Sequence, residues 1–274
     1  MKNLKELSKD SLSEVKALAF DLDDTLSKFP DGVPAHIFAS LETLQKKGFK
    51  ILMVTGRPAG WADMIARMLP FDGVVAENGS VLYFWPEGRF KREETQAMSR
   101  LFWNQKEKNF SKTFNDESRE LKANVQKKIL KALPQAQVAS DQSFRLFDLA
   151  IDFAEEVHPP LGLDKAFEIQ KYFEEEGATA KVSSIHVNGW WGDFSKRQGL
   201  FHLCQNFYNL DPIKELLYVG DSPNDASLFE GLDFSVGVAN LKKYVGKVPF
   251  EEPSYITEAD GPDGVAEVFK KFEV

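Results

Sequence analysis

Apolar runs and amphipathic stretches alternate along the first part of the chain. Continuous apolar residues over 16–21 and 50–54 are typical of buried strands, whereas apolar residues at helical spacing predict a helix over 35–47. A shorter helix is expected after the second run, and 73–76 and 80–84 predict a third strand with a hairpin partner. Strands that are separated by helices of this length imply a parallel, doubly wound α/β sheet.

The pattern changes after Pro86, where the chain becomes rich in charged residues. The predicted elements of this part are helices near 92–108, 117–132 and 163–176 and strands over 144–153 and 180–188. Helices and strands that lack a regular alternation are typical of an α+β unit.

The alternation of strands and helices resumes from Ser195. The predicted elements are helices over 196–208, 223–230, 240–245 and 262–272 and strands over 215–220, 234–238 and 254–257. The simplest organisation is therefore a doubly wound α/β domain made of residues 1–85 and 188–274, interrupted by an inserted α+β domain over 86–187.

Composition excludes several classes of function. The net charge of −8 and the pI near 5.2 argue against nucleic-acid binding, which relies on a basic surface. The N-terminus mixes charges without an apolar core, and no apolar stretch approaches the length of a membrane span. The single cysteine, Cys204, cannot form an intramolecular disulfide and is expected to be a core residue. We therefore expect a cytoplasmic protein without membrane partners, and its oligomeric state stays open.

The first apolar run ends in a cluster of carboxylates, with Asp21, Asp23 and Asp24 inside four positions. Like charges raise one another's pKa, so a buried strand ending in this way favours a bound cation. Strand alternation puts Asp21 and Asp23 on the same side, close enough to share one ion. The alternative is that these aspartates only form a turn or cap a helix.

Other polar residues follow the ends of neighbouring predicted strands. Thr55 follows the second strand, Asp221 and Asp225 follow the strand over 215–220, and Lys196 opens the helix before it. Ligands of doubly wound sheets bind beyond the carboxyl ends of the strands. Several carboxylate oxygens suit Mg²⁺, which brings phosphate oxygens with it, and a carboxylate can also attack phosphorus as a nucleophile.

These motifs together resemble the haloacid dehalogenase (HAD) hydrolase superfamily. Its motifs one to four are similar, in order, to Phe-Asp21-Leu-Asp23-Asp24-Thr25-Leu, Val-Thr55-Gly-Arg, Lys196 and Val-Gly220-Asp221-Ser-Pro-Asn224-Asp225. The insertion between motifs two and three resembles a type II cap, and the Asn78-Gly79 turn is similar to that of the type IIB subgroup, which includes sugar phosphatases. The resemblance implies a Rossmannoid core with an inserted α+β cap.

The resemblance also implies catalytic roles. Asp21 would attack the phosphoryl group, and Asp23 would be the general acid for the leaving alcohol and then the base for water. Thr55 would hydrogen-bond a phosphoryl oxygen, and Lys196 would pair with Asp21 and the phosphate. The alternatives are a helix cap for Thr55 and a solvated helix-start lysine for Lys196, in which case Arg197 could substitute.

A Mg²⁺ site is implied in the same way. Asp21 would bind the metal through its carboxylate, Asp23 through its main-chain carbonyl, and Asp221 directly. Asp225 would support the metal directly or through water, although an aspartate at a helix start also favours the helix dipole.

The expected function is a Mg²⁺-dependent phosphatase that hydrolyses a small phosphorylated metabolite, a sugar phosphate, through an aspartyl-phosphate intermediate. One alternative is a phosphomutase of the same superfamily. Another is a catalytically silent, phospho-accepting or metabolite-binding module, which the acid at Asp23 argues against.

Three aromatic residues and one arginine stay without an assigned role. His186, Trp190 and Trp191 precede the third motif, where the tryptophans could stack on a sugar or pack a hinge between the domains. Arg57 could be structural or an ordinary surface residue.

Overall fold

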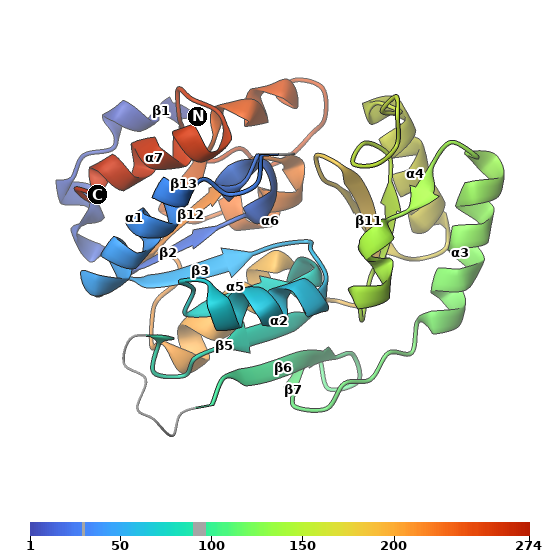
Figure 1. The fold of residues 1–274 in the computed structure, drawn as a ribbon, viewed down its shortest axis with the longest axis horizontal. Helices are drawn as coiled ribbons and strands as arrows, with labels where there is room; N and C mark the ends of the chain where they lie inside the picture. Colours follow the sequence, from blue (N-terminus) through green and yellow to red (C-terminus); the bar gives the residue numbers. More distant parts are fainter. Residues whose placement is uncertain (29–30, 90–96) are drawn as a thin grey trace.

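The chain folds into two lobes. The computed structural model describes residues 1–28, 31–89 and 97–274, and within these ranges the strands form one sheet of ten strands and one of four. Figure 1 shows the smaller sheet and helices α3 (Arg119–Ala132) and α4 (Leu163–Glu175) as a separate lobe beside the larger sheet. We call these parts the small lobe and the core lobe.

The larger sheet is mostly parallel. Its order is β1-β14-β13-β12-β2-β3-β4-β5-β6-β7, and the pairs from β1 to β4 are parallel whereas those from β4 to β7 are antiparallel. The strands are β1 (Lys2–Asn3), β2 (Ala17–Phe20), β3 (Lys50–Val54), β4 (Gly73–Ala76), β5 (Val81–Phe84), β6 (Ser99–Asn104), β7 (Asn109–Ser111), β12 (Leu216–Gly220), β13 (Phe234–Gly237) and β14 (Tyr255–Ile256). The expected hairpin of β4 and β5 is confirmed.

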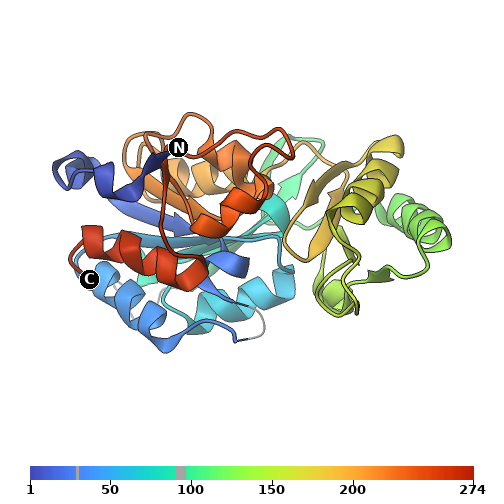
Figure 2. The ribbon, with the colours of Figure 1, turned by 90° about the horizontal axis from the view of Figure 1, so that it is seen from above.

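Helices cover both faces of this sheet, which confirms the doubly wound α/β core. Helices α1 (Ala35–Lys46), α2 (Ala59–Met68) and α7 (Gly261–Lys271) cover one face, and α5 (Lys196–Phe207) and α6 (Ala226–Phe229) cover the other (Figure 2). Strand alternation divides the core accordingly, because Leu18 and Phe20 of β2 pack with the first group and Ala17 and Ala19 with the second. Cys204 is buried on the second face, as expected for a core residue.

The expectation of a helix near 92–108 was wrong for its described part. Residues 99–104 form β6 and 109–111 form β7, while 90–96 lie outside the described residues. Phe102 pairs with Val81 of β5, and the aromatic side chains of this segment become buried because β6 extends the sheet. The free energy of this burial outweighs the preference of the charged residues for a helix.

The strand expected over 144–153 is shorter than predicted. Only Leu149–Asp152 form strand β9, and a helical turn over Ser140–Phe144 precedes it. Two charged residues between them, Arg145 and Asp148, are buried in a polar network described below. Residues 145–148 contribute to this network and do not pair with a neighbouring strand.

The small lobe is an antiparallel sheet with two helices on it. Its strands, in the order β10-β11-β9-β8, are β8 (Gln137–Val138), β9, β10 (Thr179–Val182) and β11 (His186–Trp190). Apolar residues of α3, α4 and the strands, including Ile129, Phe173 and Val187, form its own core. The expected division at 86 and 187 stays a prediction. We propose that the inserted unit runs from α3 to β11, because β6 and β7 belong to the larger sheet.

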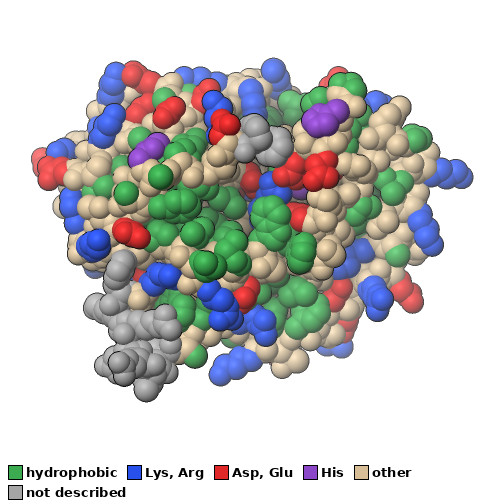
Figure 3. Space-filling view, viewed as in Figure 1, with side chains coloured by type: hydrophobic (Ala, Val, Ile, Leu, Met, Phe, Trp, Pro, Cys, Tyr) green, Lys and Arg blue, Asp and Glu red, His purple; other side chains and the backbone are tan. Residues whose placement is uncertain are grey.

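Exposed apolar side chains gather around α2, near the middle of the face in Figure 3. Trp61, Met64 and Met68 of α2 are exposed, and so is Phe144 of the small lobe, which packs over Gly60. Among the described residues, none of the helices combines the length and the apolar character needed to cross a bilayer.

Candidate active site

Three parallel strands bring the predicted polar residues to one edge of the larger sheet. Strand β2 lies between β12 and β3, with Phe20 paired to Val219 on one side and to Met53 on the other. The next residues beyond these strand ends therefore lie together. They include Asp21, Thr55 and Asp221, all of which are buried.

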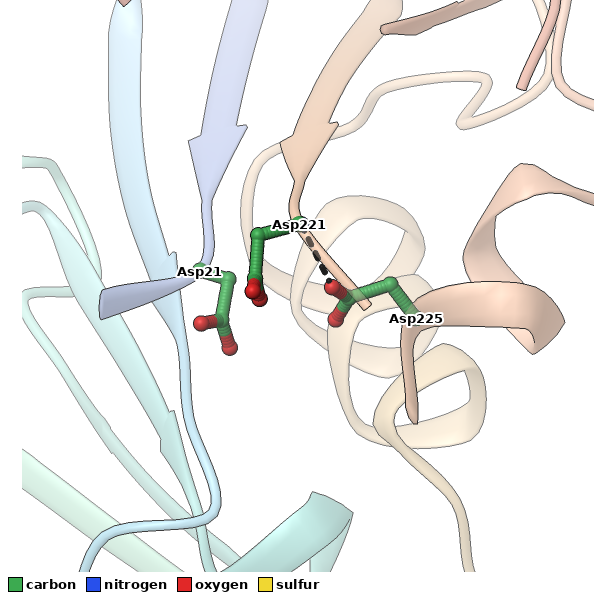
Figure 4. Close-up of side chains that lie close together, drawn as sticks. All are labelled: Asp21, Asp221 and Asp225. Carbon is green, nitrogen blue, oxygen red and sulfur yellow. Dashed lines mark hydrogen bonds between the residues drawn. The ribbon is translucent and has the colours of Figure 1, made fainter. Parts of the chain in front are cut away.

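Three carboxylates converge at this edge. Oxygen atoms of Asp21, Asp221 and Asp225 all lie within 4.8 Å of one another. Figure 4 shows the three side chains pointing toward a common centre, with Asp225 reaching back from the turn that follows β12. The structure thus brings together three of the four residues expected around a metal.

The protonation of the cluster reflects its burial. Burial raises the pKa of Asp21 to about 8, and the negative charges of Asp225 and Asp23 add to this against the opposing effect of Lys196. Burial and the charge of Asp21 also raise the pKa of Asp221 well above its ordinary value. The carboxylates therefore resist joint ionisation without more positive charge. A hard divalent cation such as Mg²⁺, which prefers carboxylate oxygens, fits this donor set.

Lys196 supplies one positive charge inside the cluster. Its Nζ lies 2.6 Å from Oδ1 of Asp21 and 2.7 Å from Oδ1 of Asp225. Ser195 caps α5 by accepting the N–H of Gln198, which fixes the helix start that carries the lysine. Burial lowers the pKa of Lys196, but Asp21 and Asp225 outweigh this effect and raise it, so the ammonium stays charged.

Asp225 is fully committed to hydrogen bonds. Its Oδ1 accepts from Lys196 and from the hydroxyl of Tyr218 at 2.7 Å, and its Oδ2 accepts from the N–H groups of Asp221 at 3.0 Å and Ser222 at 3.3 Å. In this arrangement Asp225 holds the lysine and the backbone that carries Asp221.

Asp23 lies at the side of the site that faces the small lobe. The backbone turns sharply behind it, since Asp24 adopts a left-handed φ of 55°. Its carboxylate accepts two hydrogen bonds of 2.9 Å, one from Nε and one from Nη2 of Arg57. Arg57, which had no assigned role, is therefore a direct neighbour of a predicted catalytic residue.

Thr55 makes a local turn at the end of β3. Its Oγ1 accepts the N–H of Arg57 at 2.9 Å, and its own N–H binds the carbonyl of Val75. The hydroxyl hydrogen is thus left to be donated toward the site. Helix α2 begins only at Ala59, so this hydrogen bond shapes the loop before the helix.

The small lobe closes over the aspartates. A cavity of about 20 Å³ remains, which is room for about one water molecule. Residues of the core lobe that line it include Asp21, Asp23, Lys196, Asp221 and Asn224, and those of the small lobe are Arg145, Ser183, Ser184, Ile185, His186 and Asn188.

A buried glutamate, which the sequence analysis missed, joins the two lobes. Glu77 accepts the N–H of Ala59 in the core lobe at 2.8 Å and the N–H groups of Leu146, Phe147 and Asp148 in the small lobe at 2.8, 2.6 and 3.2 Å. Its φ of 44° is left-handed. Burial and the charge of Asp148 raise the pKa of Glu77 to about 7, against the opposing effects of Arg145 and the N–H donors.

Arg145 extends this junction. It donates to Asp141 and Asp148 and, at 2.7 Å, to the carbonyl of Gly56 in the core lobe. Asp148 in turn accepts from Asn78 at 3.2 Å. One feature of the sequence indicates this network: Arg145 and Asp148 are charged residues inside the otherwise apolar run over 144–153.

The aromatic residues before the third motif divide between two roles. Trp190 is buried and stacks on Phe194, with ring centroids 5.6 Å apart, which is packing at the junction of the lobes. Trp191 lines a different cavity of about 450 Å³ together with Trp103. His186 faces the small cavity above the aspartates.

Comparison with known families gives one extended match. The model of the haloacid dehalogenase-like hydrolase family matches residues 18–269. This range includes both lobes and each of the predicted site residues.

Individual proteins are similar over nearly the whole chain. A phosphoglycolate phosphatase of Methanothermobacter thermautotrophicus is 24% identical over 266 residues, covering 94% of this chain and 99% of its own. The phosphatase YwpJ of Bacillus subtilis is 25% identical over 291 residues, with 93% and 99% covered. Among solved structures, the HAD subclass IIB sugar phosphatase BT4131 matches with a TM-score of 0.60 at 16% identity, covering 94% of this chain and 99% of its own. At this identity the structural match shows the fold.

Proposed function

The chain belongs to the haloacid dehalogenase-like hydrolase family, and from this premise we propose that it is a Mg²⁺-dependent phosphatase of small sugar phosphates. The observation that carries the proposal is the position of Asp21. Its carboxylate lies at the end of the central strand β2, beside the ammonium of Lys196 and within 4.8 Å of two more carboxylates. A nucleophile, a fixed cation and a metal-binding oxygen set are thus gathered at one point, as phosphoryl transfer requires.

In the proposed reaction Asp21 attacks phosphorus. A bond forms between a carboxylate oxygen and phosphorus, and the bond from phosphorus to the leaving oxygen breaks, which gives an aspartyl phosphate. Lys196 stabilises the negative charge on the phosphoryl oxygens, and its hydrogen bond to Oδ1 orients the carboxylate.

Asp23 handles the protons in both halves of the reaction. As general acid, in its protonated form, it gives its proton to the departing alkoxide; the carboxylate that this leaves then acts as base and takes a proton from the water that attacks the aspartyl phosphate. Thr55 donates its hydroxyl hydrogen to a phosphoryl oxygen. Phosphate then leaves, and the carboxylate of Asp21 is restored.

The residues present fit a Mg²⁺ site. The carboxylates of Asp21 and Asp221 and the main-chain carbonyl of Asp23 would hold the ion. When bound, Mg²⁺ supplies positive charge that stabilises the phosphoryl oxygens. Asp225 supports the site through Lys196 and the backbone of Asp221, because its oxygens already accept four hydrogen bonds.

The lining of the cavity supports a neutral, hydroxyl-rich leaving group. The small lobe contributes the polar side chains of Ser183, Ser184, His186 and Asn188. Both arginines at the cavity, Arg57 and Arg145, already pair with carboxylates. A leaving group with its own carboxylate, such as that of phosphoglycolate, would therefore meet only paired arginines there, whereas a sugar hydroxyl needs only a neutral donor or acceptor such as the hydroxyl of Ser184.

The small lobe acts as the cap in this proposal. A cavity of about 20 Å³ cannot hold a sugar phosphate, so the lobe must move away to admit one and return to exclude water. A cytoplasmic location is part of the proposal, because the one cysteine is a buried thiol.

The test is release of inorganic phosphate from a panel of sugar phosphates and phosphoglycolate by the purified protein. We expect hydrolysis of sugar phosphates that is lost with EDTA and restored by Mg²⁺. The variant Asp21→Asn should be folded by circular dichroism and inactive, whereas Asp24→Asn, a matched loss of charge beside the site, should stay active. The proposal is wrong if no phosphate ester is hydrolysed, or if hydrolysis persists undiminished in excess EDTA after dialysis.

A further inference from the structure

The guanidinium of Arg57 is shared between the two lobes. Its Nε and Nη2 each donate to Asp23 at 2.9 Å, and its Nη2 and Nη1 donate to Glu155 of the small lobe at 2.7 and 3.2 Å. Nη1 also lies 3.4 Å from Oδ2 of Asp141. The ring of Trp61 packs against the guanidinium at 4.8 Å, so this group is held on three sides.

Glu155 is itself held firmly in the small lobe. Asp152, at the end of β9, accepts the N–H groups of Ala154, Glu155 and Glu156, each at 2.8 Å, which fixes the turn. Nε2 of His186 lies 2.8 Å from Oε2 of Glu155 on the cavity side. Burial raises the pKa of Glu155, but His186 and Arg57 outweigh it and lower the pKa to about 2, so the side chain is a carboxylate at neutral pH.

These contacts leave Arg57 no donor for a substrate. A guanidinium has five N–H groups, and five are directed at Asp23, Glu155 and Asp141. In the closed arrangement Arg57 therefore acts on Asp23 and not on a phosphate.

We propose that Arg57 is a positioning residue that orients the carboxylate of Asp23, and that Glu155 fixes Arg57 only while the small lobe is closed. This inference rests on the proposed function, since it gives Asp23 the role of acid and base. When the lobe opens, Glu155 moves away from the guanidinium, and Nη1 and Nη2 of Arg57 lose the hydrogen bonds that they donate to it. The proton-transfer group is then held correctly only after the cap has closed over the substrate.

The test uses two variants. Arg57→Lys keeps the positive charge but loses the planar guanidinium that donates two hydrogen bonds to Asp23, and Glu155→Gln keeps the shape of the side chain but loses its negative charge. The matched control is Glu156→Gln, the exposed neighbour whose carboxylate accepts the hydroxyl of Ser140. The measurement is the first-turnover rate of leaving-group release, by rapid quench, for a sugar phosphate and for an activated aryl phosphate. The aryl alcohol leaves without a proton, so the rate of its release depends on correct folding and on attack by Asp21 and does not depend on Asp23.

We expect both variants to slow release from the sugar phosphate about tenfold or more, as a misplaced catalytic group does, and to leave the aryl burst and the control unchanged. In an Asp23→Asn background neither variant should cause a further loss, because both act through Asp23. Equal losses on both substrates, or losses that multiply with Asp23→Asn, would overturn the inference while the phosphatase proposal stands. A wild-type protein that hydrolyses no ester would overturn both.

Discussion

Lys196 Nζ lies 2.6 Å from Asp21 Oδ1, although 175 positions separate the two residues in the chain. Asp21 follows β2 before the small lobe, and Lys196 opens α5 after it. Both side chains are almost inaccessible to solvent, so the ion pair escapes most of the screening that weakens surface pairs. The pair therefore joins the two parts of the chain that flank the small lobe as well as orienting the proposed nucleophile.

Removing this lysine should unfold the core lobe more easily. Lys196→Met leaves the buried carboxylates of Asp21 and Asp225 without their cation. Breaking a buried pair in this way costs up to about 3 to 5 kcal/mol, and less where Asp21, whose pKa is about 8 even beside the lysine, takes up a proton. We expect the free energy of unfolding in urea to fall by that order without metal, and millimolar Mg²⁺ to restore part of it. Lys171→Met, at an exposed position of α4, is the control. A loss no larger than that of the control would contradict this account.

Replacing the proposed acid should separate substrates by their leaving groups. General acid catalysis contributes about a hundredfold to ten-thousandfold, so Asp23→Asn should nearly abolish turnover of sugar phosphates. An activated aryl phosphate should still form the aspartyl phosphate, and hydrolysis of that intermediate should be slow because the base is missing. Rapid-quench kinetics should show a burst of aryl alcohol followed by weak turnover. Equal losses on both substrates without a burst would count against Asp23 as acid and base.

Gly79 should not tolerate a side chain. A Cβ at this position would lie 2.0 Å from the carbonyl oxygen of Ser195, and its φ is +116°. Gly79→Ala must therefore push α5 and Lys196 away from the sheet. The control is Gly177→Ala, where φ is +76° but nothing lies within 4 Å, so it measures the backbone cost alone, roughly 1 to 2 kcal/mol.

We expect Gly79→Ala to lower the free energy of unfolding by about 1 to 3 kcal/mol more than Gly177→Ala, the usual cost of overpacking. It should also lower the rate of phosphate release, because Lys196 moves with its helix. Equal effects of the two substitutions on the free energy of unfolding would show that α5 shifts to relieve the clash at little cost in stability.

Glu77 should give stability a specific pH dependence. Its ordinary pKa of 4.5 is raised to about 7 in the folded protein, so between these values the folded state binds more protons than the unfolded one. Folding stability contributed by Glu77 therefore falls as pH rises from 4.5 to 7 and is constant above, by up to about 3 kcal/mol in total.

Glu77→Gln carries no charge at any pH and removes this contribution. The free energy of unfolding of the wild type minus that of the variant, measured in urea at several pH values, should decline across the window. Other titrating groups are common to both proteins and largely cancel in this difference. A difference that stays flat or rises from pH 4.5 to 7 would show that the N–H donors outweigh the effect of burial.

The central site positions could be predicted from sequence for a simple reason. Asp21, Thr55 and Asp221 each follow a short apolar run, and parallel strands put such positions at one edge of a sheet. Their placement there is confirmed, while the roles assigned to them stay predictions.

The contacts between the lobes could not be predicted in this way. Arg57 meets Asp141 and Glu155 across 84 and 98 positions, and no periodic pattern shows which way an inserted lobe closes. The role of Glu77 could not be predicted either, because its partners are backbone N–H groups, which almost any residue can supply. The helix expected near 92–108 failed because an edge strand pairs with β5, and pairing depends on a neighbour elsewhere in the chain.

The volume of about 20 Å³ above the aspartates has a consequence for affinity. In the proposed mechanism substrate associates only with the fraction of molecules whose small lobe is open, so the dissociation constant for this first encounter is the intrinsic one divided by that fraction. A substitution that loosens the junction, such as Glu155→Gln, is expected to enlarge the open fraction and so to speed substrate association while it slows chemistry. In that mechanism the closed arrangement lowers the affinity of the first encounter with substrate and, in exchange, excludes bulk water from an ordered reaction site.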